Sequence, residues 1–325
     1  MHKSKIYFVT LDETGGIALI LALGTPLPVN VRPWKFFKVD AVMISAYYII
    51  KNKALRRKIY QKGIKDVLDF DGLVILDSGA FQALHSGIQI DFYELVDIYK
   101  NVEDADFKLS LDWPEDKIIE NYSKMQKYEV SPVISAETLE HLSFFENVNG
   151  WIFVGRLAKI LRHYGRNGFN ILNDKLTYVS SVAKSNVWAL GVGNCKTLPI
   201  LAQNDIEGAD TSSYRVAAAY GDIIIPGRGT CHISGRKTKK RNWGLYNVEE
   251  NDVREYLSFL GLSFDDLKRS FEARVLFNAY ILMTVKSFLL NQKPIKLVKS
   301  PLCKGYNVFV FVKKNYYAVF AFFRK

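Results

Sequence analysis

The sequence of 325 residues lacks the features that mark several classes of protein. It has only three cysteines, Cys195, Cys231 and Cys303, and no Cys-x-x-Cys pair, which argues against a disulfide framework and a zinc knuckle. The longest strictly apolar runs, such as residues 17–23, are much shorter than the roughly 20 residues that span a bilayer. The apolar run at residues 6–9 is too short for the core of a signal peptide. We therefore expect reduced thiols in a soluble, cytoplasmic protein without a membrane partner.

Acidic residues are fewer than basic ones, with 33 Asp and Glu against 44 Lys and Arg, so the net charge is +11. A content of 49% hydrophobic and 24% charged residues is ordinary for a globular chain and excludes a disordered one. The basic excess favours a polyanionic partner, although it also suits a protein that is merely soluble. Its placement is more informative, because one glycine-containing window concentrates cations that we expect to contact nucleic-acid phosphates: Arg228, Arg236, Lys237, Lys239, Lys240 and Arg241.

Short apolar runs alternate with longer amphipathic stretches from residue 39 onward. The runs, which read as strands, cover residues 39–45, 73–77, 107–112, 131–135, 151–155, 187–191, 206–210 and 222–226. The stretches between them carry apolar residues at the helical spacing of three and four, at 54–68, 92–102, 118–128, 139–147 and 171–183. Eight strand–helix units predict a parallel, closed (β/α)₈ (TIM) barrel, with an open doubly wound sheet as the alternative.

The chain divides into three expected regions. Residues 1–38 hold short strands punctuated by glycine and proline, which predicts an N-terminal cap. Residues 39–290 form the barrel and the C-terminal helices, which we expect at 249–259, 264–270 and 272–290. Residues 291–325 contain two runs of apolar, strand-favouring residues, 308–312 and 316–323, around a Lys313-Lys314-Asn315 turn, so they are expected to form a β-hairpin tail.

Three carboxylates, Asp77, Asp112 and Asp210, each end one of the apolar runs. Each of them alone would be read as the cap of a following helix. A barrel gathers its strand ends at one mouth, so the three together favour a catalytic site. Two carboxylates at such a mouth can perform displacement at an anomeric carbon, one as nucleophile and the other as acid and then base. The residues by themselves leave the substrate open.

One segment carries a family resemblance. Asp77-Ser78-Gly79-Ala80-Phe81-Gln82 resembles the Asp-Ser-Gly-Gly-(Phe/Tyr)-Gln signature of the tRNA-guanine transglycosylase superfamily, with Ala80 in place of the second glycine. Other segments are similar to further motifs of that family: residues 44–48, 110–112, 133–136, 150–155, 190–193, 205–210 and 274–283. The matches come in the family's order and extend from about residue 6 to about residue 290. Each match is weak, but the ordered set is strong.

The resemblance implies an enzyme that exchanges a guanine in a nucleic acid for a free 7-deazaguanine base, such as preQ0, without a cofactor. It implies that Asp210 is the nucleophile at C1′ and that Asp77 is the general acid and base. Asp112 would accept hydrogen bonds from the Watson–Crick edge of the purine, and Phe81 would stack on the base. The base-binding residues that it implies are Asp112, Ser135, Gly155, Ser78, Phe81 and Gln82.

Departures from the family pattern carry expectations of their own. The zinc-binding Cys-x-Cys-x-x-Cys cluster is missing and Phe277 stands in place of a zinc-binding His, so we expect no metal. Ser45 and Ser135 replace Asn and Gln, which indicates an altered choice of base or, as the alternative, a lost activity. The missing zinc module, and the lack of room for an RNA-binding extension, slightly favour DNA over tRNA as the polymer. The alternative is a catalytically silent binder of nucleic acid or of a partner subunit, against which the retained Asp77 and Asp210 argue; the sequence is also compatible with an oligomer.

Overall fold

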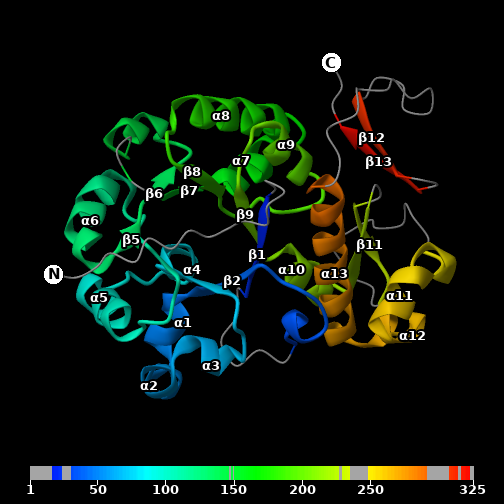
Figure 1. The fold of residues 1–325 in the computed structure, drawn as a ribbon, viewed down its shortest axis with the longest axis horizontal. Helices are drawn as coiled ribbons and strands as arrows, with labels where there is room; N and C mark the ends of the chain where they lie inside the picture. The colour runs from blue at the N-terminus through cyan, green and yellow to red at the C-terminus, as the bar shows by residue number, and fades with distance from the viewer. Residues whose placement is uncertain are drawn as a thin grey trace.

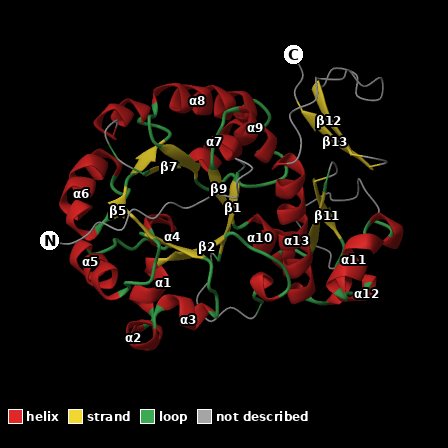
Figure 2. Ribbon diagram, in the orientation of Figure 1, coloured by secondary structure: helices red, strands yellow, loops and turns green. Residues whose placement is uncertain are grey.

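The computed structural model describes residues 17–23, 31–145, 148, 150–226, 229–234, 248–290, 307–313 and 316–322. Its main feature is a ring of parallel strands surrounded by helices (Figures 1 and 2). The strands follow the order β5-β4-β3-β2-β1-β9-β8-β7-β6. Their bounds are β1 (Ala18–Ala22), β2 (Ala41–Ser45), β3 (Leu73–Asp77), β4 (Phe107–Leu109), β5 (Val130–Ser131), β6 (Val133–Ser135), β7 (Trp151–Gly155), β8 (Asn186–Ala189) and β9 (Gly208–Thr211).

The two ends of this order meet, because β5 and β6 are separated along the chain by Pro132 alone. Proline has no N–H to complete a strand ladder, so the strand is divided into two short pieces. Ser110 N donates to Ser131 O at 2.9 Å on one side, and Phe153 N donates to Pro132 O at 3.0 Å on the other. The nine strands therefore form a nearly closed, barrel-like sheet that is consistent with the predicted TIM-like fold.

The prediction of which apolar runs build the barrel is wrong at both ends. The last run forms β10 (Asp222–Ile225), which pairs antiparallel with β11 (Gly229–His232) in a separate sheet. Its place is taken by β1, which we expected in the cap but which lies between β2 and β9. The run at β10 is buried beneath α10 (Ser213–Ala219) and α13 (Phe271–Leu290) instead. A buried strand shows the same apolar pattern whichever sheet it joins.

The helices alternate with the strands broadly as the sequence predicts. The expected helix at 54–68 is divided by Gly63, whose φ of +85° favours glycine, and the segment at 139–147 is the 3₁₀ helix Leu139–Phe145. The remaining α-helices are α1 (Ala46–Lys51), α2 (Lys53–Lys62), α3 (Ile64–Leu68), α4 (Ala80–His85), α5 (Phe92–Asn101), α6 (Ile118–Met125), α7 (Leu157–Tyr164), α8 (Gly168–Val182), α9 (Leu198–Gln203), α11 (Arg254–Leu260) and α12 (Phe264–Arg269). Further 3₁₀ turns lie at Pro33–Lys35, Glu115–Lys117, Gln126–Tyr128 and Glu250–Asp252.

Large apolar side chains fill the inside of the barrel. Trp188 is fully buried there, and its ring lies 5.0 Å from that of Phe153 and 4.8 Å from that of Trp151. Gly208 makes room for it, because a Cβ atom at that position would lie 2.3 Å from Trp188 Nε1. A barrel filled in this way is a packed core and not a channel, and the side chains that fill it lie beneath the mouth.

The long helix α13 attaches the C-terminal segments to the barrel. The fully buried Asn278 accepts a hydrogen bond from Ile224 N at 2.7 Å and donates to Asp222 O at 3.2 Å, so it joins α13 to β10. Lys286 pairs with Asp40 at 2.6 Å and thereby joins α13 to the segment before β2. Further along the chain, β12 (Asn307–Lys313) and β13 (Tyr316–Phe322) form an antiparallel pair. Among the helices of the described ranges, none combines the length and apolarity that a bilayer crossing requires.

Candidate active site

Strand alternation sets which residues face the mouth of the barrel. Ile75, Val133 and Phe153 belong to the cluster that fills the barrel interior. Side chains two residues apart on a strand point to the same face, so the strand ends above this cluster also face inward. The register places Ser45 beside Asp77 and Ser135 beside Gly155. The carboxyl-end positions that face inward by this argument are Ser45, Asp77, Ser135, Gly155 and Asp210.

Asp77 lies at the end of β3 in a tight turn. Gly79 N donates to Asp77 Oδ2 at 3.0 Å, so the side chain stabilises the turn that leads into α4. Gly79 has a φ of +83°, and a Cβ atom there would lie 2.6 Å from the backbone nitrogen of Tyr47, so only glycine fits this position. Burial, reinforced by the negative charges of Asp112 and Asp210, raises the pKa of Asp77 to about 7. Asp77 can therefore both hold and release a proton near neutral pH.

Asp210 lies buried in β9 and is wrapped by the glycine-rich turn after β8. Gly191 N donates to Asp210 Oδ1 at 2.5 Å, and Gly193 N donates to Asp210 O at 2.8 Å. A Cβ atom at Gly193 would lie 2.9 Å from that same backbone oxygen, which explains the need for glycine. Burial raises the pKa of Asp210 to about 6, while the Gly191 N–H stabilises the anion and limits the rise. Asp210 is therefore mostly ionised at neutral pH.

Asp112 follows β4; it is hydrogen-bonded to Ser78 and lies near Gly155. Ser78 Oγ donates to Asp112 Oδ1 at 3.2 Å, and a Cβ atom at Gly155 would lie 3.7 Å from Asp112 Oδ2. Burial raises the pKa of Asp112, and the nearby charge of Arg156 opposes that rise. Ser78 itself is fully buried and also accepts a hydrogen bond from Ala80 N at 3.3 Å, so its hydroxyl group orients Asp112.

Arg156 is a residue of this region that the sequence analysis missed. Its guanidinium carbon lies 5.0 Å from the centre of the Trp113 ring, and its Nη2 lies 3.2 Å from Glu115 Oε1. Arg156 thus clamps the segment that follows Asp112 onto the start of α7. Its φ of +66° is left-handed, which is uncommon for a residue other than glycine. The signal in the sequence was a cation directly after the strand-end glycine, Gly155.

The other predicted base-binding residues lie around the same turns. Ser45 Oγ donates to Gln82 Oε1 at 3.0 Å, which joins the end of β2 to α4. Ser135 is 2% exposed and its hydroxyl accepts a hydrogen bond from Glu137 N at 3.1 Å. Phe81 is 52% exposed, and its ring lies 4.1 Å from that of His85. The structure therefore brings Gln82 and Phe81 onto the first turn of α4, directly after Asp77.

Two further sequence predictions depend on other parts of the chain. The cations of the predicted basic loop, Arg236, Lys237, Lys239, Lys240 and Arg241, lie outside the described residues, so their role stays a prediction. In the ranges that are described, no three His, Cys, Asp or Glu side chains gather as metal ligands. Phe277, which stands where the family has a His, is fully buried and its ring lies 6.2 Å from that of Tyr256. Phe277 belongs to the apolar core, and the absence of zinc stays a prediction.

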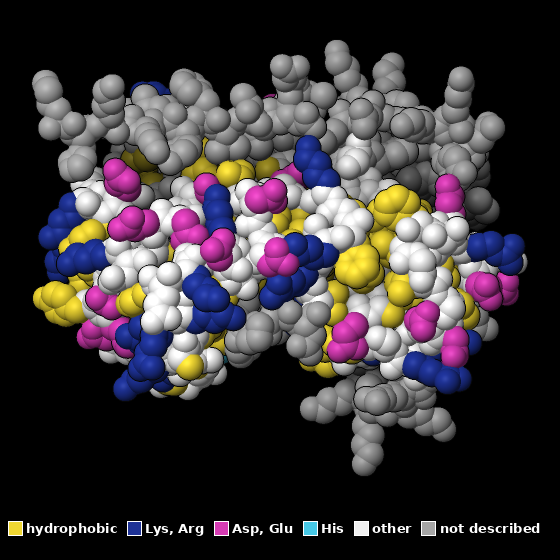
Figure 3. All heavy atoms as spheres, turned by 60° about the horizontal axis from the view of Figure 1, so that its bottom comes forward, with side chains coloured by type: hydrophobic (Ala, Val, Ile, Leu, Met, Phe, Trp, Pro, Cys, Tyr) yellow, Lys and Arg dark blue, Asp and Glu magenta, His cyan; other side chains and the backbone are white. Residues whose placement is uncertain are grey.

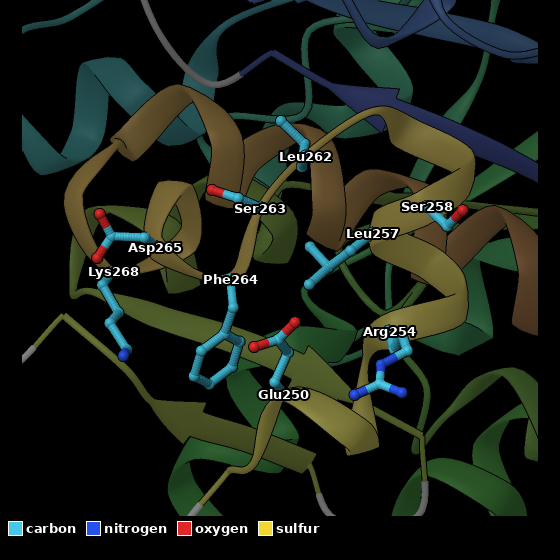
Figure 4. Close-up of a pocket in the computed structure, with 9 residues that line it drawn as sticks. All are labelled: Glu250, Arg254, Leu257, Ser258, Leu262, Ser263, Phe264, Asp265 and Lys268. Atoms are coloured by element: carbon cyan, nitrogen blue, oxygen red, sulfur yellow. The ribbon is translucent and has the colours of Figure 1, made fainter.

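A hollow of about 450 Å³ lies apart from the barrel mouth, on α11 and α12 (Figure 4). Its lining mixes apolar side chains, such as Leu257 and Phe264, with charged ones. Figure 4 shows the Phe264 ring between the side chains of Lys268 and Glu250, and Lys268 Nζ lies 4.6 Å from the centre of that ring. None of the three strand-end carboxylates lines this hollow, so we place the candidate chemistry at the mouth.

Comparison with known proteins supports the resemblance seen in the sequence. No protein-family model matches the chain. The tRNA-guanine(15) transglycosylase of Pyrococcus furiosus is 26% identical over 156 residues, which is 47% of this chain and 27% of that enzyme. That of Thermococcus onnurineus is 25% identical over 229 residues, covering 64% of this chain and 39% of the enzyme. The matched segments thus span well under two thirds of these relatives' length. Over part of its length, the chain is a distant homologue of archaeal tRNA-guanine(15) transglycosylases.

Proposed function

We propose that this protein is a pentosyltransferase that exchanges a guanine base in a nucleic acid for a 7-deazaguanine base. The observation that carries the proposal is the pair of carboxylates at the barrel mouth, Asp77 and Asp210, whose surroundings set their pKa values at about 7 and about 6. The neighbouring charges of Asp112 and Asp210 favour the protonated form of Asp77, whereas the Gly191 N–H favours the ionised form of Asp210. Asp77 is the better proton carrier, and Asp210 is the better anion.

In the first half of the proposed reaction, a carboxylate oxygen of Asp210 attacks C1′ of the target nucleotide. The bond between C1′ and the guanine nitrogen breaks, and its electron pair leaves with the base. Asp77 gives its proton to the departing base, so guanine leaves as a neutral molecule. The sugar is then held as an ester of Asp210, which resembles the covalent intermediate of retaining glycosidases.

In the second half, Asp77 is a carboxylate and acts as a base. It accepts the proton from the ring nitrogen of the incoming base, and that nitrogen attacks C1′. The ester bond to Asp210 breaks, which restores the free carboxylate, and Asp77 again carries a proton. The same residue serves as acid and then as base because its pKa of about 7 lies near neutral pH.

Recognition of the purine is assigned to Asp112 and its supports. An ionised carboxylate accepts hydrogen bonds from two neighbouring N–H groups, such as those on the Watson–Crick edge of guanine. Ser78 and Arg156 both favour the ionised form of Asp112. Gly155 has no side chain, which leaves the space beside Asp112 Oδ2 open to a base. The exposed ring of Phe81, on the first turn of α4, would stack on the base.

Two polymers are candidates for the substrate. The relatives are named for tRNA, whereas the lack of the family's Cys-x-Cys-x-x-Cys cluster in this sequence slightly favours DNA. A base within either duplex must first be extruded from its helix, which costs a few kcal/mol. An assay that offers both polymers side by side decides between them.

The test is exchange of labelled guanine into unmodified tRNA and into duplex DNA, together with a denaturing gel for the covalent adduct. Asp210→Asn should bind the polymer but form no adduct and exchange no base, because the anionic nucleophile is gone. Asp77→Asn should slow formation and breakdown of the adduct by about 10²- to 10⁴-fold, the usual worth of general acid–base catalysis. Asp205→Asn is the matched control, because Asp205 is exposed, lies in the loop before β9 and has a left-handed φ that Asn tolerates.

Undiminished exchange by the Asp210→Asn variant would remove the nucleophile assignment. Binding by the wild-type protein without exchange or adduct, on both polymers and with both guanine and a 7-deazaguanine, would identify a catalytically silent binder.

A further inference from the structure

Exposed cations are concentrated on α2 and at the helix end before it. We call these residues the basic stripe: Lys51, Lys53, Arg57, Lys58 and Lys62. All five are exposed, and the four on α2 form two pairs four residues apart, Lys53 with Arg57 and Lys58 with Lys62, which lie on adjoining sides of the helix. At a rise of 1.5 Å per residue, these four extend over about 14 Å. In Figure 3, which brings the α2 side of the molecule forward, Lys and Arg side chains gather at the left, where α2 lies.

The opposite face of α2 is used to attach the helix to α5. Leu55 and Ile59 are buried, and Arg56 pairs with Glu94 at the start of α5. One turn later, Tyr60 donates to Asp97 Oδ2 at 2.9 Å. The contacts that attach α2 to α5 therefore do not involve the side chains of the basic stripe, which stay available for another role.

The basic stripe has no acidic partner in the described part of the chain. None of its five members forms an ion pair with any residue in the described ranges, and α2 contains no Asp or Glu. Some exposed cations on other helices do have an acidic partner, such as Lys124 with Glu120 on α6 and Arg269 with Asp265 on α12. Like charges four residues apart, as in Lys53 with Arg57 and Lys58 with Lys62, destabilise a helix slightly. The fold thus keeps these positive charges unneutralised, at a small cost in helix stability. A bound polyanion would neutralise the charges and remove that cost.

One end of the basic stripe lies beside the mouth of the barrel. Gly79, in the turn of Asp77, lies so close to Tyr47 that a Cβ atom there would be 2.6 Å from the Tyr47 backbone nitrogen. The ammonium group of Lys51 lies 6.0 Å from the centre of the Tyr47 ring. From there α2 runs along α5 toward the opposite end of the barrel, since Ile64 N, just beyond α2, is held by Asp104 at 3.0 Å ahead of β4. The basic stripe therefore starts near Asp77 and leads away over the outer wall.

We propose that the basic stripe binds the phosphate backbone of the nucleic acid whose target nucleotide enters the barrel mouth. The ammonium and guanidinium groups along α2 can each contact a phosphate, because phosphates recur at regular intervals along a nucleic-acid strand. Such contacts position the polymer but do not read its sequence. The proposal rests on the proposed function only for its choice of polymer, and its test measures binding and not exchange.

The test compares two variants with the same loss of charge. In the stripe variant, Lys53, Arg57, Lys58 and Lys62 become Gln, which favours helices and keeps most of the side-chain length. In the control variant, four exposed cations on α6, the turn after it and α12 become Gln: Lys124, Lys127, Lys268 and Arg269. The dissociation constants of labelled duplex DNA and unmodified tRNA are measured from about 50 to 200 mM salt, the range in which phosphate contacts change affinity most. Each lost phosphate contact lowers the slope of log K against log salt by about 0.9 for duplex DNA.

We expect the slope to fall by roughly 2 to 4 units in the stripe variant and by less than about 1 in the control. Equal slopes in the wild-type and stripe proteins would overturn the proposal, and so would an equal fall in both variants, which would show an effect of net charge alone. Loss of affinity for anionic lipid vesicles with unchanged affinity for nucleic acid would assign the basic stripe to a membrane surface and overturn it as well.

A second measurement uses the wild-type protein, so its result does not depend on whether the stripe variant folds. Bound nucleic acid should protect Lys51, Lys53, Lys58 and Lys62 from acetylation, read by mass spectrometry, while Lys124 and Lys268 react as before. Equal reactivity of both groups would overturn the proposal. Protection without any base exchange would retain the basic stripe and reject the catalytic function, so the two failures can be told apart.

Discussion

The hydroxyl group of Ser78 donates a hydrogen bond to Asp112 Oδ1 across 3.2 Å, and this bond joins the turn that carries Asp77 to the residue assigned to the purine. A hydrogen bond to an ionised group contributes about 1.5 to 3 kcal/mol. The residue proposed for acid–base catalysis and the residue proposed to read the base are thus joined, although they come from different strand ends.

Ser78→Ala should therefore weaken binding of the free base more than it slows the chemical step. We expect KM for guanine to rise by roughly 10-fold or more, since about 1.4 kcal/mol corresponds to a tenfold change, with a small change in kcat. Steady-state exchange with varied guanine measures both constants. Because Ser78 also bonds Ala80 N, a fall in kcat at constant KM would instead place the effect on the turn of Asp77.

The pH dependence of adduct formation should be a narrow bell. Asp210 must be ionised to attack, so the rate should rise with pH through about 6. Asp77 must be protonated to release guanine, so the rate should fall as pH rises through about 7. Single-turnover adduct formation between pH 5 and 9 measures both limbs. In Asp77→Asn the alkaline limb should vanish and the acid limb remain; a retained alkaline limb would assign it to another group.

Asp77→Asn should stabilise the folded protein at high pH and have little effect at low pH. Folding raises the pKa of Asp77 from 3.8 to about 7, so the folded state binds more protons than the unfolded state between these values, and the stability contributed by this group falls as pH rises across them. Asn carries no charge at any pH and avoids that loss. Denaturant unfolding at pH 4 and pH 8 should show a gain on the order of 1 to 4 kcal/mol at pH 8 only. Asp205→Asn, at an exposed position, should show no such difference, and an equal gain at both pH values would contradict this origin of the effect.

Arg156→Met should move base binding to higher pH. The charge of Arg156 opposes the burial that raises the pKa of Asp112, so its removal should raise that pKa further. Each unit of increase weakens binding about tenfold at a pH below both the old and the new pKa, if the base requires the ionised form. KM for guanine between pH 5 and 9 measures the shift. Arg156→Lys keeps the positive charge without the flat group over Trp113, so its pH profile should match the wild type; a shifted Lys profile would attribute the effect to the clamp on Trp113.

The sequence predicted the barrel-like class and the positions of Asp77 and Asp210 in strands, because both depend on local sequence patterns. A strand buried on both faces must be apolar throughout, and a helix that packs on it must be apolar at every third or fourth position, so both periods are written into the chain. Asp77 and Asp210 stand out because a charge that directly ends such a run is visible without a fold.

The choice of barrel strands was decided by tertiary structure. Residues 18–22 and 222–225 are both apolar and buried, and burial alone does not reveal what covers a strand. Whether β1 or β10 completes the ring depends on α10 and α13, which pack over β10 and leave the position between β2 and β9 to β1.

The roles of Ser78 and Arg156 were likewise outside the reach of the sequence. Ser78 meets a partner 34 residues away, and Arg156 meets Trp113 and Glu115 from a different strand end. A hydrogen bond or ion pair between distant residues leaves no periodic trace, because it depends on which turns the closed sheet brings together. The sequence thus determines which candidate catalytic residues the chain contains, and the folded barrel decides which neighbours orient them and set their charge.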